Sequence, residues 1–182
     1  MPTIYLVRHG KAAAGWDTDL DPGLDNLGRN QADKAAQSLA VIGPLAIISS
    51  PLARTRETAI PLAAKWHCDP RIEPRITEIP SPTDNLSERA GWLRGVMGDK
   101  WCNLDQDLRN WRQGVIEAVQ GLEQDTVIFS HFIAINVVAG AAEGNEQVVV
   151  FLPDNGSITI IETRADGFRM VERGAEAGTR VN

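Results

Sequence analysis

The stretch TIYLVRHG, residues 3–10, decides the fold of this chain. Its first part, Ile4 to Val7, is an apolar and partly β-branched run, long enough for one strand and too short for most helices. Because polar residues do not alternate with apolar ones, the run predicts a strand buried on both faces, as in a parallel sheet between two helix layers. Arg8 and His9 follow at once, so a cation and an imidazole stand at the carboxyl edge of the sheet, where open α/β sheets bind ligands. Gly10 then allows the backbone to turn sharply and to approach a bound group closely.

Two later stretches repeat this arrangement. Residues 45–48 (LAII) run into residues 49–51 (SSP), and Arg54 stands three positions further on. Residues 127–129 (VIF) run into residues 130–131 (SH). Three apolar strands that each end in hydroxyl, imidazole or guanidinium groups predict one site for an oxyanion at a shared edge of the sheet.

Length and charge narrow the class of protein. A chain of 182 residues with 43% hydrophobic and 23% charged residues is typical of one soluble globular domain, which we expect to span residues 1–182. The net charge of −6 and the pI near 5.1 argue against a nucleic-acid partner, because no basic stripe is present to neutralise a phosphate backbone. An anionic ligand must therefore be captured by a few local cations, which favours a small site over a broad surface.

The cysteines and the apolar segments indicate where the protein works. Cys68 and Cys102 are too few for a disulfide framework and lack the spacing of metal ligands. No basic region precedes the first apolar run, which predicts no signal peptide, and no apolar stretch reaches the ~20 residues that cross a bilayer. We therefore expect a cytoplasmic protein with reduced thiols, no membrane partner and no bound metal. The oligomeric state is left open.

The remaining elements follow from periodicity and from capping residues. Asp25 is a candidate N-cap for a helix over residues 27–39, and Ser50 a candidate N-cap for a second helix with Pro51 at its first position. Asp154-Asn155-Gly156 is a turn signal of the kind that joins antiparallel strands. Further helices are expected at residues 86–96, 104–122 and 133–142, and further strands at residues 126–130, 148–152, 157–161 and 168–171.

Together these elements predict an α/β fold. We expect a three-layer α/β/α sandwich with a mainly parallel central sheet and a short helical insertion at about residues 80–115, packed over or beside the site.

The ordered set of motifs resembles the histidine phosphatase superfamily, which includes the cofactor-dependent phosphoglycerate mutases. The similarity lies in residues 8–10 (RHG), residues 50–54 (SPLAR) with residues 58–59 (TA), residues 130–131 (SH), and the segment that opens the first helix. It extends from residue 3 to about residue 161, and it implies the phosphoglycerate mutase-like version of the predicted fold.

The resemblance also implies roles for five residues. His9 corresponds to the nucleophile that takes the phosphoryl group on its imidazole. Arg8, Arg54 and His131 match the phosphate pocket of the family. Glu78 is the best match for the proton donor, in a loose motif with Glu73 and Glu88 nearby.

Three departures from the family pattern lie around the expected leaving-group pocket. Lys11 stands where many members carry an acidic or amide residue. Trp16 is followed by a carboxylate where the mutases have a Trp-Asn pair, and the pair lies further from Arg8. Phe132 follows His131 where glycine is frequent. Lys11 and Trp16 are therefore candidate substrate-binding residues. The resemblance does not imply that this chain acts on the same substrate as the mutases.

The chemistry of phosphoryl transfer agrees with these roles. It requires an in-line nucleophile and a cage of positive charge around the equatorial oxygens, and guanidinium groups bind phosphate oxygens in pairs. We predict a metal-independent phosphomonoester phosphatase that works through phospho-His9 on a small phosphorylated substrate, without a cofactor. The alternatives are phosphoglycerate mutase-type transfer, a protein phosphohistidine phosphatase, and a protein that binds a phosphorylated ligand without catalysis.

Overall fold

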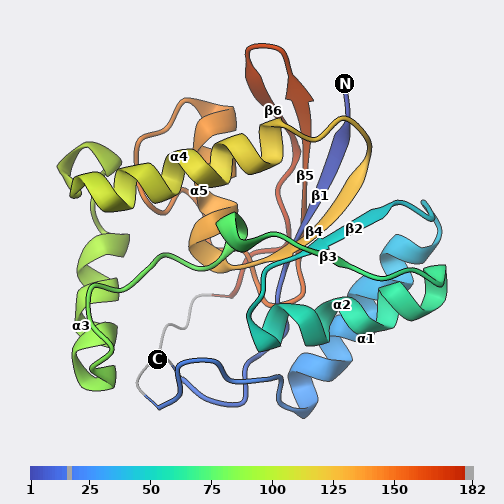
Figure 1. Cartoon of the computed structure of the whole chain (residues 1–182), viewed down its shortest axis with the longest axis horizontal. Helices are drawn as coiled ribbons and strands as arrows, with labels where there is room; N and C mark the ends of the chain where they lie inside the picture. The colour runs from blue at the N-terminus through green and yellow to red at the C-terminus, as the bar shows by residue number, and fades with distance from the viewer. Residues whose placement is uncertain (16–17, 179–182) are drawn as a thin grey trace.

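The computed structural model describes residues 1–15 and 18–178. Within these residues a six-stranded sheet has the order β3-β2-β4-β1-β5-β6 (Figure 1). The strands are β1 (Thr3–Arg8), β2 (Ala46–Ser49), β3 (Arg71–Ile72), β4 (Thr126–Ser130), β5 (Ile158–Arg164) and β6 (Gly167–Glu172). The α-helices are α1 (Asn26–Ala40), α2 (Ala53–Trp66), α3 (Leu86–Met97), α4 (Gln106–Gln120) and α5 (Phe132–Glu143), and the 3-10 turns are η1 (Pro74–Ile76) and η2 (Trp101–Asn103).

The pairing of the strands confirms the mainly parallel sheet. β1 is parallel to β4, and β2 is parallel to both β4 and β3. Only β5 and β6 are antiparallel to their neighbours among the described strands. Since β1, β2 and β4 run in the same direction, their carboxyl ends meet at one edge of the sheet, as the three sequence stretches predict.

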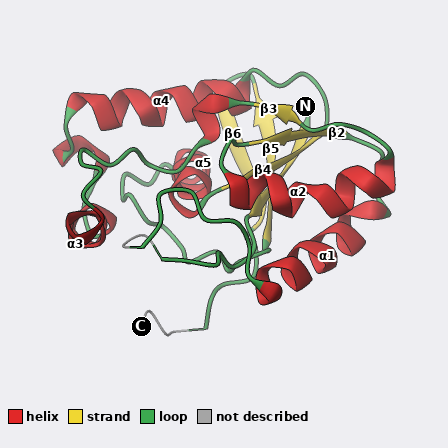
Figure 2. Cartoon of the chain, turned by 60° about the horizontal axis from the view of Figure 1, so that its bottom comes forward, coloured by secondary structure: helices red, strands yellow, loops and turns green. Residues whose placement is uncertain are grey.

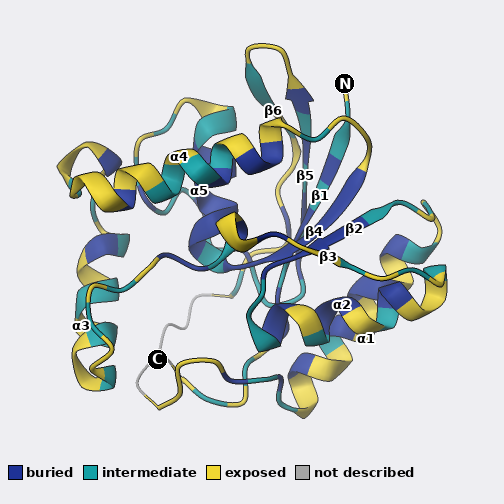
Figure 3. Cartoon of the chain, viewed as in Figure 1, coloured by how far each residue is buried: buried dark blue, intermediate teal, exposed yellow. Residues whose placement is uncertain are grey.

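The three layers follow from the alternation of side chains along the strands. Ile4 and Leu6 of β1 belong to the apolar cluster formed with α4 and α5. Val7 of the same strand belongs to the other cluster, in which Ala35 of α1 and Leu62 of α2 are buried. Accordingly, α1 and α2 cover one face of the sheet and α4 and α5 cover the other (Figures 1 and 2). The central strands β1 and β4 are buried on both sides (Figure 3), so the predicted α/β sandwich is confirmed.

The helix predicted at residues 27–39 is confirmed by α1, whose N-cap is Asp25. The Asp25 carboxylate accepts a hydrogen bond of 2.7 Å from the Gly28 N–H. The helices predicted at residues 86–96 and 104–122 correspond to α3 and α4. Of these, α4 packs on α5 in the outer layer, whereas α3 stands outside the three layers, on the opposite side from α1 and α2 (Figure 1). The expectation of a single domain with an insertion stays a prediction.

Two local expectations are wrong. α2 begins at Ala53 with Leu52 as its N-cap, so Ser50 does not cap it. Ser50 instead accepts a hydrogen bond of 3.3 Å from the Leu52 N–H within the turn that leaves β2.

Residues 148–152 do not form a strand, although Val148 and Phe151 are buried. The buried Asn136 side chain of α5 accepts hydrogen bonds from the Val150 and Phe151 N–H groups. A side-chain amide therefore satisfies donors that a neighbouring strand would otherwise bind. The turn at residues 154–156 consequently follows an irregular segment and precedes β5. No helix among the described residues is long and apolar enough to cross a membrane.

Candidate active site

His9 stands directly after β1, and its orientation is fixed by backbone bonds on three sides. Its N–H donates to the Ser130 carbonyl at 3.0 Å, and its carbonyl accepts from the Asn155 side chain at 2.9 Å. The imidazole Nδ1 lies 2.7 Å from the Gly10 carbonyl oxygen. Because a carbonyl only accepts, the hydrogen on the neutral ring is on Nδ1. The lone pair of Nε2 is therefore directed away from this backbone and toward the site.

The turn after His9 requires glycine at position 10, because the backbone of α1 leaves no room for a side chain there. A Cβ atom on Gly10 would lie 2.3 Å from the Gly28 carbonyl oxygen at the start of α1. The Gly10 N–H donates to the Thr58 hydroxyl at 3.0 Å, and that hydroxyl donates to the Arg54 carbonyl at 2.6 Å. The first turns of α2 and the end of β1 are thereby joined beside the nucleophile candidate.

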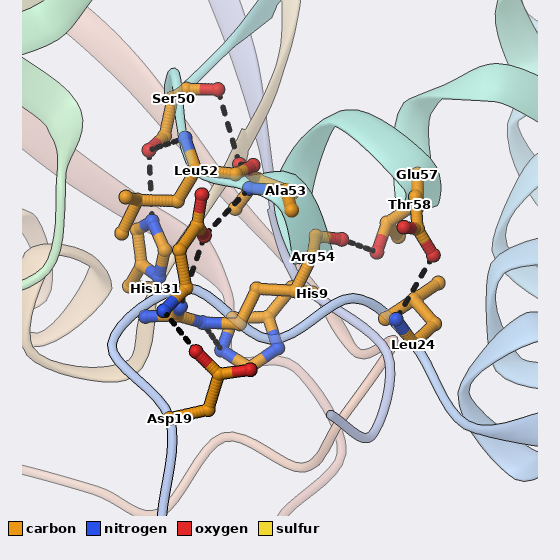
Figure 4. Close-up of polar contacts among 12 residues, drawn as sticks. His9, Asp19, Leu24, Ser50, Leu52, Ala53, Arg54, Glu57, Thr58 and His131 are labelled. Atoms are coloured by element: carbon orange, nitrogen blue, oxygen red, sulfur yellow. Dashed lines mark hydrogen bonds and ion pairs between the residues drawn. The ribbon is translucent and has the colours of Figure 1, made fainter. Parts of the chain in front are cut away.

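Arg54 extends from the first turn of α2 and meets His9 (Figure 4). Its Nε–H donates to His9 Nε2 at 3.2 Å. One guanidinium nitrogen, Nη1, lies 3.9 Å from the Asp21 carboxylate, which also accepts a hydrogen bond of 2.8 Å from the Ala53 N–H. Asp21 thus caps the N-terminus of α2, the role predicted for Ser50. It does so from a loop more than thirty positions earlier in the chain.

His131 lies beside His9, with ring centroids 5.2 Å apart. It follows β4 and is the N-cap residue of α5. Its Nε2 and the Ser50 hydroxyl form a hydrogen bond of 2.8 Å. Its Nδ1 is buried without a hydrogen-bond partner among the described residues. Buried polar atoms are nearly always partnered, so this nitrogen is a candidate for contact with a ligand.

Arg8 also borders the site, in the cavity that His9 and Glu78 line. Its Nη1 donates to the Pro153 carbonyl at 2.8 Å, and its guanidinium lies 5.1 Å from the centre of the Phe132 ring. Burial lowers the pKa of Arg8, while the carboxylates of Glu78 and Asp154 act in the opposite direction. Arg8 Nε is a second buried donor without a partner in the described part of the chain.

Glu78 is buried at the same site. Its Oε1 accepts hydrogen bonds from the Ile79 N–H at 3.1 Å and from the Ile133 N–H at 3.0 Å. Burial raises the pKa of this carboxyl, against the lowering effect of those bonds and of the two arginines. The other two acids near it in sequence lie elsewhere, because Glu73 pairs with Arg75 and Glu88 bonds residues at the start of α3.

The electrostatics keep His9 neutral. Burial, followed by the nearby charges of Arg54 and Arg8, lowers the pKa of His9 from 6.5 to about 3. Burial also lowers the pKa of His131 well below its usual value, with His9 and the arginines adding to the effect. Both imidazoles are therefore uncharged near pH 7, and the net positive charge of the site comes from its guanidinium groups.

A cavity of about 1200 Å³ opens beside these residues. It is bordered by Arg8, His9 and Glu78, and it continues along α3 and the start of α5. A narrower space of about 40 Å³ lies between His9, Arg54 and Arg89. Lys11 borders the large cavity, and its ammonium group forms an ion pair of 3.0 Å with Asp25. Trp16, the other candidate substrate-binding residue, lies outside the described residues.

Sequence reasoning missed two residues that support the site. From the sequence, Asn155 is predicted only as part of a turn. In the structure its side-chain amide donates a hydrogen bond to the His9 carbonyl. Asp21 lies in a loop with several other aspartates, and nothing in the sequence indicates that Asp21, and not Asp19, contacts the start of α2. Among residues 1–15 and 18–178, no group of three or more His, Cys, Asp or Glu side chains could hold a metal ion.

A neutral imidazole, two guanidiniums and a buried carboxyl meet at the carboxyl edge of the parallel strands, an arrangement that suits an oxyanion ligand. Sequence comparison identifies the protein family to which the chain belongs. The chain belongs to the histidine phosphatase superfamily, branch 1, whose sequence pattern matches residues 4–176.

Curated relatives agree with this family. A probable phosphoglycerate mutase GpmB of Cronobacter sakazakii is 35% identical over 110 residues, which are 53% of this chain and half of the relative. The protein of the same description from Erwinia tasmaniensis is 27% identical over 79% of this chain and 76% of its own length.

Among solved structures, a mycobacterial glucosyl-3-phosphoglycerate phosphatase with VO3 has a TM-score of 0.72 and 21% identity, covering 97% of this chain and all of its own. The phosphoserine phosphatase of Entamoeba histolytica with 3-phosphoglyceric acid has a TM-score of 0.75 and 21% identity, covering 96% and 98%. At these identities the structures show the shared fold.

Proposed function

We propose that this protein is a phosphomonoester phosphatase that forms a phosphohistidine on His9 and needs no metal ion. The observation that carries the proposal is the state of His9. Its Nδ1–H is held by the Gly10 carbonyl, and its Nε2 is unprotonated and faces Arg54. Such an imidazole has its lone pair directed at the place where a phosphoryl group is held.

In the first step His9 Nε2 attacks phosphorus, and the bond from phosphorus to the ester oxygen breaks. Arg8, Arg54 and His131 hold the three remaining oxygens. The buried Arg8 Nε–H gains an acceptor in this complex, and so does His131 Nδ1 in the tautomer that carries its hydrogen there and accepts the Ser50 hydroxyl at Nε2. Glu78 gives its proton to the leaving oxygen, because burial keeps the carboxyl protonated at higher pH than an exposed glutamate.

In the second step water attacks the phosphohistidine. The Glu78 carboxylate takes a proton from that water, the P–N bond breaks, and inorganic phosphate leaves. His9 Nε2 regains its lone pair and Glu78 its proton, so the cycle closes. Both hydrogen bonds from Ile79 and Ile133 end on Oε1 of Glu78, which favours Oε2 as the oxygen that carries the proton.

The test is a phosphoenzyme trap. With ³²P-labelled substrate in EDTA, wild-type protein quenched in alkaline SDS should carry a label that is stable in alkali and lost in acid, as phosphohistidine is. His9→Ala should carry none and should release phosphate from p-nitrophenyl phosphate at no more than a thousandth of the wild-type rate. His67→Asn is the matched control, since His67 is exposed and ends α2 in a left-handed conformation that asparagine accepts. Wild-type turnover in the His9→Ala protein would refute the proposal.

Mutase-type transfer is the second candidate, since several curated relatives are described as probable phosphoglycerate mutases. It shares the first step and differs in returning the phosphoryl group to a hydroxyl of the substrate. Incubation with 3-phosphoglycerate separates the two functions. Formation of 2-phosphoglycerate faster than inorganic phosphate would favour the mutase, and the reverse ratio would favour the phosphatase.

A further inference from the structure

One face of α3 borders the active site. Leu93 and Met97 line the large cavity, and Arg89, one turn earlier, lines the narrow space beside His9 and Arg54. The spacing of four residues places all three on one face of the helix. Since α3 stands outside the three layers of the fold (Figure 1), this face is available to form a wall of the pocket.

The cavity wall beyond the phosphoryl site is largely apolar. Phe132, Ile133 and Leu152 line it together with the two apolar residues of α3. Phe132 also lies under the Arg8 guanidinium, so the apolar wall begins at the edge of the phosphoryl site. The leaving group of a bound ester must extend along this wall, because the cavity continues from His9 in that direction.

The charged residues of the same cavity do not favour a second anion on the substrate. Apart from Arg8 and Glu78 of the phosphoryl site, its described charged residues are one cation, Lys11, and two carboxylates, Asp25 and Asp154. Lys11 is already paired with Asp25 at 3.0 Å. Arg89 lines the separate narrow space beside His9 and Arg54, together with the carboxylate Asp19, and does not border this cavity. A carboxylate on the leaving group would therefore meet more negative than positive charge.

We propose that the preferred substrates are phosphate monoesters of neutral, apolar alcohols, whose alkyl or aryl groups lie on Leu93, Met97 and Phe132. This inference rests on the proposed phosphatase function. It distinguishes the chain from structural neighbours whose names or complexes involve phosphoserine and phosphoglycerate.

The test uses a series in which the reacting bond is constant. Ethyl, butyl and hexyl phosphate differ only in apolar length, and 3-phosphoglycerate and O-phosphoserine add a carboxylate. We expect kcat/KM to rise by about fourfold for each methylene that is buried on the wall, until the wall is covered. Hexyl phosphate should then exceed 3-phosphoglycerate by at least tenfold. Equal rates along the alkyl series, or a preference for the two carboxylates, would overturn the inference.

Substitutions in α3 test whether Leu93 causes the dependence of kcat/KM on the length of the alkyl chain. Leu93→Gln should flatten the dependence on chain length, and Leu93→Arg should raise kcat/KM for 3-phosphoglycerate relative to hexyl phosphate. Arg94→Gln is the matched control, because Arg94 is the next residue of the helix and is exposed. Thermal unfolding of each variant verifies that the fold is retained. An unchanged dependence in both Leu93 variants would overturn the assignment of this wall.

The two proposals fail in different ways. If His9-dependent hydrolysis occurs without any dependence on chain length, only the substrate inference is wrong. If no ester is hydrolysed and no phosphoenzyme forms, the proposed function is wrong, and the substrate inference falls with it.

Discussion

The Arg54 Nε–H donates a hydrogen bond of 3.2 Å to His9 Nε2, the nitrogen that the proposed mechanism assigns to the attack on phosphorus. In that mechanism the Arg54 N–H must leave the imidazole and donate to an oxygen of the phosphoryl group. Arg54 also adds to burial, the larger effect, in lowering the pKa of His9. Under the proposed function, Arg54 therefore links substrate binding to activation of the nucleophile.

Arg54→Gln should lower kcat/KM by about 10²–10³-fold, as is usual when one donor to a transition-state oxyanion is removed. It should also raise the pKa of His9 above about 3, because a nearby positive charge is lost while burial remains. NMR titration of the imidazole measures that shift. Arg56→Gln, an exposed change on the same helix, is the control. An unchanged His9 pKa in Arg54→Gln would contradict the electrostatic role.

Glu78→Gln should affect esters according to how much their leaving group needs a proton. The amide oxygen can still accept the N–H groups of Ile79 and Ile133, but it supplies no acidic proton. We expect a loss of about 10²–10⁴-fold with ethyl phosphate. The loss with p-nitrophenyl phosphate should be below about tenfold, because nitrophenolate leaves without protonation. Equal losses with both esters would exclude Glu78 as the proton donor, and Glu88→Gln is the control.

The wild-type pH profile should have a limb on the alkaline side that belongs to Glu78. Its folded-state pKa is raised, so the acid form persists above the usual range and disappears as the pH rises through the raised value. With ethyl phosphate, kcat/KM should fall over that range, because kcat/KM reports the groups of the free enzyme. The pKa of about 3 for His9 means that protonation of the nucleophile does not limit kcat/KM between pH 5 and pH 8.

Acid stability should reflect the neutral, buried state of His9. Its folded pKa is lowered, so between pH 6.5 and about pH 3 the unfolded chain binds a proton that the folded chain does not. Stability therefore falls as the pH drops through 6.5, by up to about 1.4 kcal/mol for each pH unit from this group. Urea unfolding of His9→Gln should show a correspondingly smaller loss between pH 6.5 and pH 4.5. The same slope in the variant and the wild type would contradict the lowered pKa, and His67→Asn should match the wild type.

Asp21 should contribute to stability mainly by capping α2. Its Oδ1 accepts the Ala53 N–H at 2.8 Å, whereas its pairing with Arg54 at 3.9 Å is long and the carboxylate is 48% exposed. Asp21→Ala should lower the free energy of unfolding by about 1 kcal/mol. Asp21→Asn should stay within about 0.5 kcal/mol of wild type, because an amide oxygen still accepts the bond. Urea denaturation measures both, and equal losses in the two variants would show that the charge matters more than the cap.

The sequence predicted the layers of the fold because its apolar runs are simple. The residues of β1 and β4 are buried on both faces, so their runs contain no polar alternation and indicate interior strands of a parallel sheet. Asp25 marked the start of α1 because the capping bond is local, joining residues three positions apart. Arg8, His9, Arg54 and His131 could be expected to meet because parallel strands share their carboxyl edge.

What the sequence did not predict depends on contacts between distant segments. The apolar run at residues 148–152 looked like a strand, but Asn136 of α5 binds its backbone instead. Ser50 was the nearest residue able to cap α2, but Asp21 reaches the helix from the loop after β1. The environment of Glu78 requires the start of α5, more than fifty positions away, which no local motif reveals.

The position of β1 between β4 and β5 also constrains biosynthesis. Residues 3–8 leave the ribosome long before either partner strand has been translated. The imidazole that follows them acquires its surroundings only when residues 126–130 and 153–164 have emerged. On the proposed function, a nascent chain that ends before residue 164 has no complete site for phosphoryl transfer.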